Sequence, residues 1–231
     1  MRILLALLWL LLLVPLLVGV VAQGRVQSVF ARYRAVRNRA GVTGAQLARV
    51  MLDAHGLRHV RVEPVDAFLA DHYDATDAAL RLSPPVAGEP SVAALGIAAH
   101  EVSHAYQDAE GSRAYRVRKR VGEPLARLAP WTGVIFIGGF WLGVPVLMAL
   151  SIAYVAGLVV FALATLPVEV GASHRALELL AQTRLADRDE LDDVRRVLRA
   201  AASTYVVGVL RQVGFLLALV MVAEAAHRAT T

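Results

Sequence analysis

The chain has 231 residues, of which 57% are hydrophobic and 19% charged, and its mean hydropathy of +0.55 is too high for an ordinary soluble domain. It contains no cysteine, which excludes disulfide scaffolds, thiol catalysis and thiolate metal sites, so any metal site must use histidines and carboxylates. The formal charge of +5 comes almost entirely from arginine, with Lys119 as the single lysine. Because no recognition motif accompanies the arginines, we expect no nucleic-acid partner and assign the charge to the flanks of membrane segments.

The first apolar stretch, residues 3–22, contains twenty residues without a charge. As a helix it would extend about 30 Å, the thickness of a hydrocarbon core, and we expect it to span the membrane. A cleaved signal peptide is the alternative, because small residues precede Gln23, but the apolar core is longer than such peptides need.

Two further regions predict three more membrane helices. Residues 131–167 carry no charge, and this length, too great for one crossing, predicts a two-helix hairpin that turns near Leu150 and Ser151. Residues 205–223 are the fourth expected span and contain Arg211. A charge within a span is costly, so we expect the Arg211 side chain to extend to the interface, with a role inside the helix bundle as the alternative.

The positions of the arginines set the expected orientation. Five arginines lie within residues 23–39 and six within residues 168–204, whereas Arg2 alone precedes the first span. By the positive-inside rule both regions face the cytoplasm, where they would contact anionic lipid headgroups. Four spans of about 19 residues leave roughly 155 residues outside lipid, enough for one small soluble domain.

These patterns predict a multi-pass cell-membrane protein with six segments. The segments are a membrane anchor at residues 1–22, a cytoplasmic domain at 23–130, a membrane hairpin at 131–167, a cytoplasmic helical segment at 168–204, a fourth membrane helix at 205–223 and a short tail at 224–231. The two cytoplasmic segments lie on the same side of the hairpin and can therefore build one site.

Short secondary-structure elements are expected within the cytoplasmic domain. Thr43 and Gln46 form the pattern of a capping box, which predicts a helix that runs to about Ala54. Alternating valines predict a strand at residues 60–65, and residues 78–82 predict a second strand. The second strand is either an ordinary member of a sheet or an edge on which an extended peptide substrate can add.

The helix that follows carries the most informative motif of the chain. Prolines and glycine predict a loop at residues 84–90, after which a helix is expected at residues 91–110. This helix contains His100, Glu101 and His104 in the order H-E-x-x-H. Histidines four residues apart share one helix face, so both imidazoles can reach one Zn²⁺ while the glutamate can touch its bound water. Two surface histidines beside a glutamate are the alternative, which the apolar sequence before the motif disfavours.

Zinc in a hydrolytic site usually takes three protein ligands and leaves a position for water. The third ligand remains open among the other histidines and carboxylates. Glu169 stands out because the second hairpin helix would deliver it at the cytoplasmic membrane surface, although an ordinary interfacial carboxylate fits the same position.

Several residues are candidates for supporting roles by their chemical type alone. Asp108, one turn beyond His104, is either a support for that imidazole or an exposed helix carboxylate. An oxyanion-stabilising group is also needed, and the candidates are His72, Tyr73, Tyr106, His174 and Arg175.

Three runs of sequence resemble the YugP-type membrane zinc metallopeptidases, namely residues 71–83, 91–107 and 165–177. The resemblance implies a gluzincin-like neutral zinc peptidase, distantly similar to HtpX-like membrane proteases, with Glu169 as the third zinc ligand. Its fold would be mainly α-helical, with four transmembrane helices and a small α+β zincin-like domain around the H-E-x-x-H helix. The chain departs from the family pattern at Ser103, where Gly is frequent, and at Gly171, where the family tends to carry Asp.

The resulting expectation is a membrane-embedded zinc endopeptidase that cleaves peptide or membrane-protein substrates, with Glu101 as the general base. The alternative is a catalytically weak or inactive metal-binding membrane scaffold of the same fold, which the glycine at position 171 favours. An intramembrane site-2-type protease is excluded, because residues 91–110 are too polar and too short to span a membrane. No oligomeric state follows from the sequence.

Overall fold

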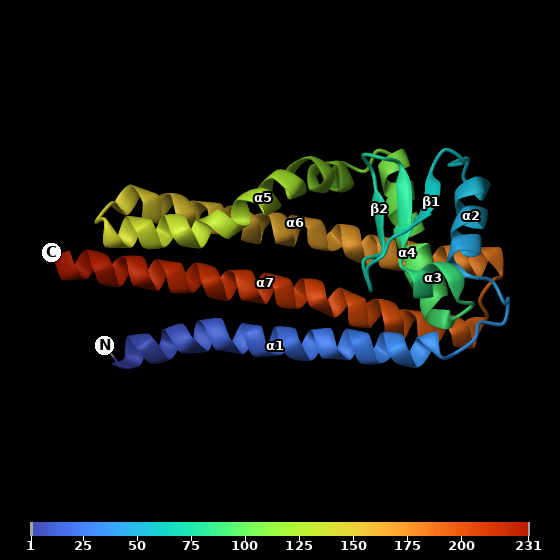
Figure 1. Cartoon of the computed structure of the whole chain (residues 1–231), viewed down its shortest axis with the longest axis horizontal. Coiled ribbons are helices and arrows are strands. Elements are labelled where there is room, and N and C mark those ends of the chain that lie inside the picture. The colour runs from blue at the N-terminus through green and yellow to red at the C-terminus, as the bar shows by residue number, and fades with distance from the viewer. Residues whose placement is uncertain (1, 231) are drawn as a thin grey trace. The chain divides into compact units, whose positions relative to one another are not determined.

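The computed structural model describes residues 2–230, apart from the side chains of residues 2–4, 123, 229 and 230. Within this range the chain forms helices joined by short connections and one small sheet (Figure 1). The elements in chain order are α1 (Arg2–Arg34), α2 (Gly44–Ala54), β1 (Arg61–Pro64), β2 (His72–Asp74), β3 (Ala79–Leu82), α3 (Pro84–Gly88), α4 (Val92–Ala109), α5 (Arg113–Trp141), α6 (Pro145–Thr183) and α7 (Arg188–Thr230). The chain is therefore mainly helical with a small α+β part, as expected.

Two compact units make up the chain. The first consists of Met1–Gln23, Val117–Leu166 and Ser203–Thr231, and the second of Gly24–Arg116 and Pro167–Ala202. The three longest helices, α1, α6 and α7, contribute residues to both units.

The first unit is built from apolar helices. Three helices of the described chain are long and apolar enough to cross a membrane, namely Leu5–Arg34, Pro145–Thr183 and Arg188–Arg228. The fourth expected span falls in α5, whose uncharged end, residues 131–141, extends only about 16 Å as a helix. Length and composition therefore support three of the four expected spans.

The turn of the expected hairpin lies earlier than the sequence suggested. α5 ends at Trp141 and α6 begins at Pro145, so the prediction of a turn near Leu150 and Ser151 was wrong. Gly143 adopts a positive φ of 65°, which glycine tolerates best, and a proline suits the first turn of the helix that follows. The Ser151 hydroxyl instead donates to the carbonyl oxygen of Leu147 inside α6 (3.0 Å).

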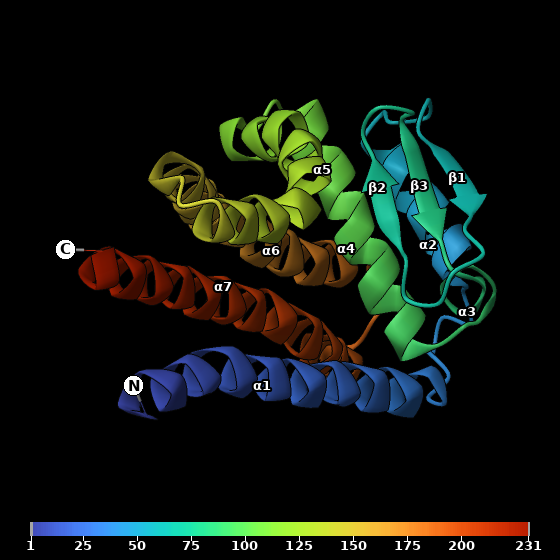
Figure 2. The same ribbon diagram turned by 60° about the vertical axis from the view of Figure 1, so that its left-hand side comes forward.

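The second unit contains a three-stranded sheet in the order β1–β3–β2. β3 lies in the middle, parallel to β1 and antiparallel to β2, so residues 78–82 do not provide a sheet edge. Both neighbours of β3 are edge strands, and β2 was not expected from the sequence. α2 and α4 pack against one another beside this sheet (Figure 2), and buried Leu80 and Leu82 of β3 join the same core.

Local capping signals account for the positions of α2 and α4. The Thr43 hydroxyl accepts the Gln46 backbone N–H (3.3 Å), while the Gln46 side chain accepts the Thr43 backbone N–H (2.9 Å), which confirms the capping box. Ser91 caps α4 by accepting the backbone N–H of Ala94 (3.1 Å). The expected loop at residues 84–90 contains the short helix α3 instead, because prolines are well tolerated in a first helical turn.

Candidate metal centre

Three side chains with potential metal-ligating atoms meet in the second unit. α4 carries His100 and His104 one turn apart, and α6 carries Glu169. Glu169 Oε2 lies 3.3 Å from His100 Nε2 and 3.6 Å from His104 Nε2. One ligating atom from each residue lies within 4.8 Å of the others, so the two segments on either side of the hairpin form one cluster.

A glutamine side chain fixes the orientation of His104. Gln107 Nε2 donates to the carbonyl oxygen of Val168 (3.0 Å), and Gln107 Oε1 faces His104 Nδ1 (2.9 Å). A carbonyl oxygen only accepts hydrogen bonds, so Val168 sets the amide orientation and His104 Nδ1 must carry the hydrogen. The lone pair of His104 is therefore on Nε2, the atom that faces Glu169.

The chemistry and spacing of these groups fit zinc. Two imidazoles and one carboxylate are ligands that zinc accepts, and two tetrahedral ligands about 2.1 Å from the ion lie about 3.4 Å apart. His104 and Glu169 are only 5% and 2% exposed, and a buried carboxylate is costly without a compensating positive charge. A divalent cation among these atoms would supply that charge. Ser173 Oγ lies 3.3 Å from the other ring nitrogen of His100, Nδ1.

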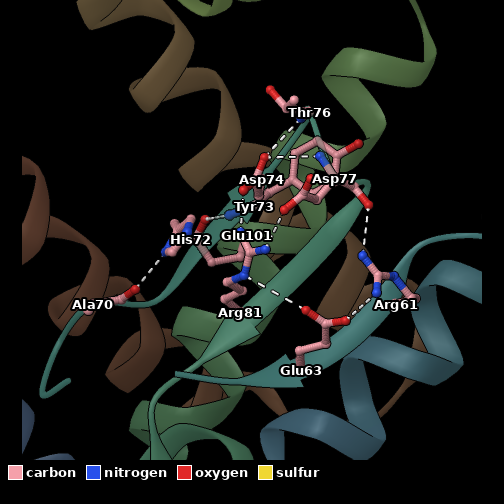
Figure 3. Close-up of polar contacts among 10 residues, drawn as sticks. All are labelled: Arg61, Glu63, Ala70, His72, Tyr73, Asp74, Thr76, Asp77, Arg81 and Glu101. Atoms are coloured by element: carbon pink, nitrogen blue, oxygen red, sulfur yellow. Dashed lines mark hydrogen bonds and ion pairs between the residues drawn. The ribbon is translucent and has the colours of Figure 1, made fainter. Parts of the chain in front are cut away.

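Glu101, which follows His100 on α4, contacts the sheet. Its Oε2 accepts the backbone N–H of Tyr73 in β2 (3.0 Å; Figure 3). Tyr73 lies opposite Leu80 of β3 in the sheet. Its backbone N–H faces away from β3, on the outer edge of β2, and there it meets the Glu101 carboxylate of α4. This contact places the edge strand β2, rather than β3, beside the catalytic candidate.

Ion pairs across the sheet hold β2 in this position. Arg81 of β3 pairs with Asp74 at the end of β2 and with Asp77 in the turn that follows, and its Nε lies 3.8 Å from Glu63 of β1 (Figure 3). Partly exposed ion pairs contribute little stability one by one, but this network connects all three strands through a single guanidinium. We infer that it sets the position of the Tyr73 backbone.

Tyr106 and Arg175, two candidates for oxyanion stabilisation, have other partners. Tyr106 is 2% exposed and its hydroxyl donates to the carbonyl oxygen of Met51 (2.5 Å), while burial raises the pKa of Tyr106 to about 12. Arg175 pairs with Glu110 (2.6 Å) and lies over the Tyr106 ring. The Tyr106 hydroxyl is therefore committed to the core rather than to the cluster of ligands.

The other predicted supporting residues lie around the site in different ways. His174 is exposed on α6, and His72 is exposed on β2 with Nδ1 2.7 Å from the carbonyl oxygen of Ala70. Asp108 accepts the Tyr73 hydroxyl (3.2 Å), and burial, with the Asp108 charge, raises the pKa of Tyr73 so that it remains a donor at neutral pH. The carboxamide of Gln107, not Asp108, is the side chain hydrogen-bonded to His104 Nδ1.

Sequence reasoning missed three residues near the ligands. Gln107 and Ser173 contact the imidazoles, and the Tyr115 ring, 6% exposed, lies 5.8 Å from the His104 ring between centroids. Gln107 lies one turn beyond His104, and that spacing is the only sequence signal that would have indicated it. Tyr115 belongs to α5 and has no local relation to the motif.

The glycine at position 171 faces the same glutamine. A Cβ at Gly171 would lie 3.5 Å from Gln107 Nε2, an ordinary contact distance. The expected aspartate at this position would therefore adjoin the Gln107 amide. The support of His104 in this chain comes from Gln107 and does not need a side chain at position 171.

Replacing Gln107 by alanine is expected to weaken zinc binding by about 10- to 100-fold, because His104 loses the partner that fixes its tautomer. The measurement is competition for zinc against a chelator. Gln182→Ala, an exposed glutamine of α6, is the control and should bind zinc like the wild type. Gln107→Glu retains an acceptor for His104 Nδ1 and should recover part of the affinity, so equal losses in both Gln107 variants would contradict the assigned contact.

The apolar helices and the histidine–carboxylate cluster on an H-E-x-x-H helix are the features of a membrane protein with a candidate metal site. The chain belongs to the family described as "Putative neutral zinc metallopeptidase", whose model matches residues 8–224. It is 40% identical over 201 residues to the "Putative membrane protease YugP" of Bacillus subtilis (strain 168), a match that covers 87% of this chain and 89% of that protein. No solved structure matches the chain. The family resemblance inferred from the sequence motifs is thus confirmed.

Proposed function

We propose that the chain is a membrane-embedded zinc endopeptidase. The observation that carries the proposal is the cluster of His100, His104 and Glu169, with ligating atoms within 4.8 Å of one another and Glu101 next to it on α4. Zinc, when bound by these three residues, supplies a Lewis acid that polarises the scissile carbonyl and acidifies water. The family membership and the membrane-protease name of the relative support this reading.

The chain's own residues perform the proton transfers in this proposal. Glu101 takes a proton from the attacking water on a carboxylate oxygen and passes it to the nitrogen of the leaving amine. The Tyr73 backbone N–H donates to Glu101 Oε2 and holds this carboxylate in one orientation.

Removal of the metal tests the proposal directly. Detergent-purified protein is expected to contain one zinc per chain and to cleave casein, to lose cleavage when a chelator removes the zinc, and to regain it on zinc addition. Stoichiometric zinc without cleavage of casein or of membrane-protein substrates would favour the scaffold alternative. Gln107 weakens the case for that alternative, because it supports His104 in place of a residue at position 171.

We further propose four membrane crossings, with the site in the cytoplasm. His100 and Glu169 lie on opposite sides of the α5–α6 hairpin in the sequence yet share one site, which requires an even number of crossings between them. If α6 crosses the membrane, α5 must cross as well. Residues 125–141 provide 17 helical residues for this crossing, with Arg127 near the cytoplasmic end, which is at the short end of the range for a spanning helix.

Reporter fusions to the full chain should give opposite signals at two positions. A reporter after residue 120 is expected to report the cytoplasm, because the arginine-rich flanks stay there. A reporter after Gly143, in the turn between α5 and α6, is expected to report the opposite side. Cytoplasmic signals at both positions would show that α5 does not cross, and an external signal at residue 120 would reverse the orientation.

A further inference from the structure

In the first compact unit, a groove lies between α1 and α7 and begins where these two helices approach each other most closely. A Cβ at Gly214 of α7 would lie 2.4 Å from the carbonyl oxygen of Leu11 in α1, so only glycine permits this approach. Within α1 the residue that would donate to the Leu11 carbonyl oxygen is Pro15, which has no N–H. The Leu11 carbonyl oxygen therefore faces α7 without its usual helical hydrogen bond. About two turns earlier in α7, a Cβ at Gly208 would meet nothing within 4 Å. The space beside Gly208 is therefore open.

Two cavities of about 340 and 350 Å³ occupy this region and share Arg211 and Leu16. The first lies between α1 and α7 and is lined by Gly208, with the polar side chains of Gln23 and Thr204 also in its wall. The second is lined by residues of α1, α5, α6 and α7, including Gln212. Arg211 lies seven residues from Thr204 on α7, about 10 Å along the helix. The wall of the first cavity therefore carries polar side chains from Gln23 and Thr204, at the ends of the apolar segments, as far as Arg211.

Two polar side chains in these walls lack partners. Among the residues that the structure describes, Arg211 has no ion pair or hydrogen bond, although it lies within an apolar span where an uncompensated charge costs several kcal/mol. Gln212 Oε1 is buried and accepts no hydrogen bond. That oxygen is enclosed by the protein, whereas the Arg211 side chain is exposed, so a ligand in the cavities would compensate Arg211 and must carry a negative charge.

We propose that these cavities bind the headgroup of a membrane phospholipid, with its phosphate at Arg211. A guanidinium matches a phosphate through paired N–H donors, and the mostly apolar walls suit the adjoining glycerol and acyl groups. The proposal rests on the membrane topology above and not on peptidase activity.

Native mass spectrometry of the full-length protein after exchange into each lipid tests this site. The wild type is expected to retain phosphatidylglycerol and to release diacylglycerol, which has no phosphate for Arg211 to bind. Arg211→Gln is expected to lower the affinity for the retained lipid about tenfold or more, because a charge-assisted contact is lost. Arg58→Gln is the matched control, since it makes the same charge change at an exposed arginine outside both cavity walls and outside the arginine-rich flanks, and it should retain lipid like the wild type.

A second variant blocks the cavity while keeping the charge. Gly208→Leu adds a side chain where space is open, so the protein should keep its elution volume and melting temperature but lose lipid to a similar extent. This variant decides the question if Arg211→Gln fails to fold. Equal retention of diacylglycerol, or wild-type retention by both Arg211→Gln and Gly208→Leu, would overturn the proposal. Zinc content measured on the same samples should not change in either variant, which separates this site from the metal centre.

Discussion

Glu101→Gln protein is expected to bind zinc like the wild type and to cleave peptides about 10²- to 10⁴-fold more slowly. Glutamine has nearly the same shape and can still accept the Tyr73 N–H, so the contact with β2 is retained. It has no basic carboxylate, however, and cannot take a proton from the attacking water. The variant therefore removes proton transfer while leaving the three proposed ligands intact.

The measurements are zinc per chain and kcat on casein or a model peptide. Glu178→Gln is the matched control, because it makes the same change at an exposed glutamate of α6 and should match the wild type in both. Cleavage at the wild-type rate by Glu101→Gln would remove Glu101 from the mechanism. A loss of zinc in this variant would instead indicate that Glu101 is itself a ligand.

Local rules predicted α2 and α4, the second of which carries the two histidines. Capping signals at Thr43 and Ser91 lie within four residues of the helices that they start, and both helices begin where these signals indicate. The i,i+4 spacing of His100 and His104 likewise needs nothing but a helix to bring the two imidazoles together. Such features depend on neighbours in the chain, so the sequence is sufficient for them.

Features that depend on distant partners were harder to predict. β2 has only three residues, too few for a period of alternation, and its place at the sheet edge follows from its pairing with β3. Topology could place Glu169 in the same compartment as the histidines but could not predict a 3.3 Å contact with His100. The role of Gln107 depends on the carbonyl oxygen of Val168, 61 residues away, and no local pattern indicates that bond.

The hairpin turn shows how a composition signal can be misplaced. The uncharged run extends from residue 131 to 167, and the turn predicted near Leu150 and Ser151 lies close to its middle. The structure places the turn at residues 142–144, so α5 enters its apolar part with Pro130 and Arg127 close by. Charged residues indicate where a helix can leave the lipid, but they do not indicate where an uncharged chain turns back. The position of the turn is set by backbone features such as the positive φ of Gly143.

Glu169→Gln is expected to abolish stoichiometric zinc binding, with a larger loss of affinity than the roughly 10- to 100-fold that loss of an outer partner costs. Glu169 Oε2 lies 3.3 Å from His100 Nε2 and 3.6 Å from His104 Nε2, so the change removes the carboxylate that faces both imidazoles. Glu169→Asp keeps the charge on a side chain shorter by one methylene and should recover part of the binding. Zinc competition against a chelator measures all three proteins.

Thermal unfolding distinguishes a lost ligand from a damaged fold. Without zinc, Glu169→Gln is expected to be at least as stable as the wild type, because Glu169 is 2% exposed and the substitution removes a buried charge. With zinc, the wild type should gain stability, since a ligand that binds only the folded state stabilises it, whereas the variant should not. The exposed Glu178→Gln should respond to zinc like the wild type. A zinc-dependent gain in Glu169→Gln equal to that of the wild type would show that the third ligand comes from another residue.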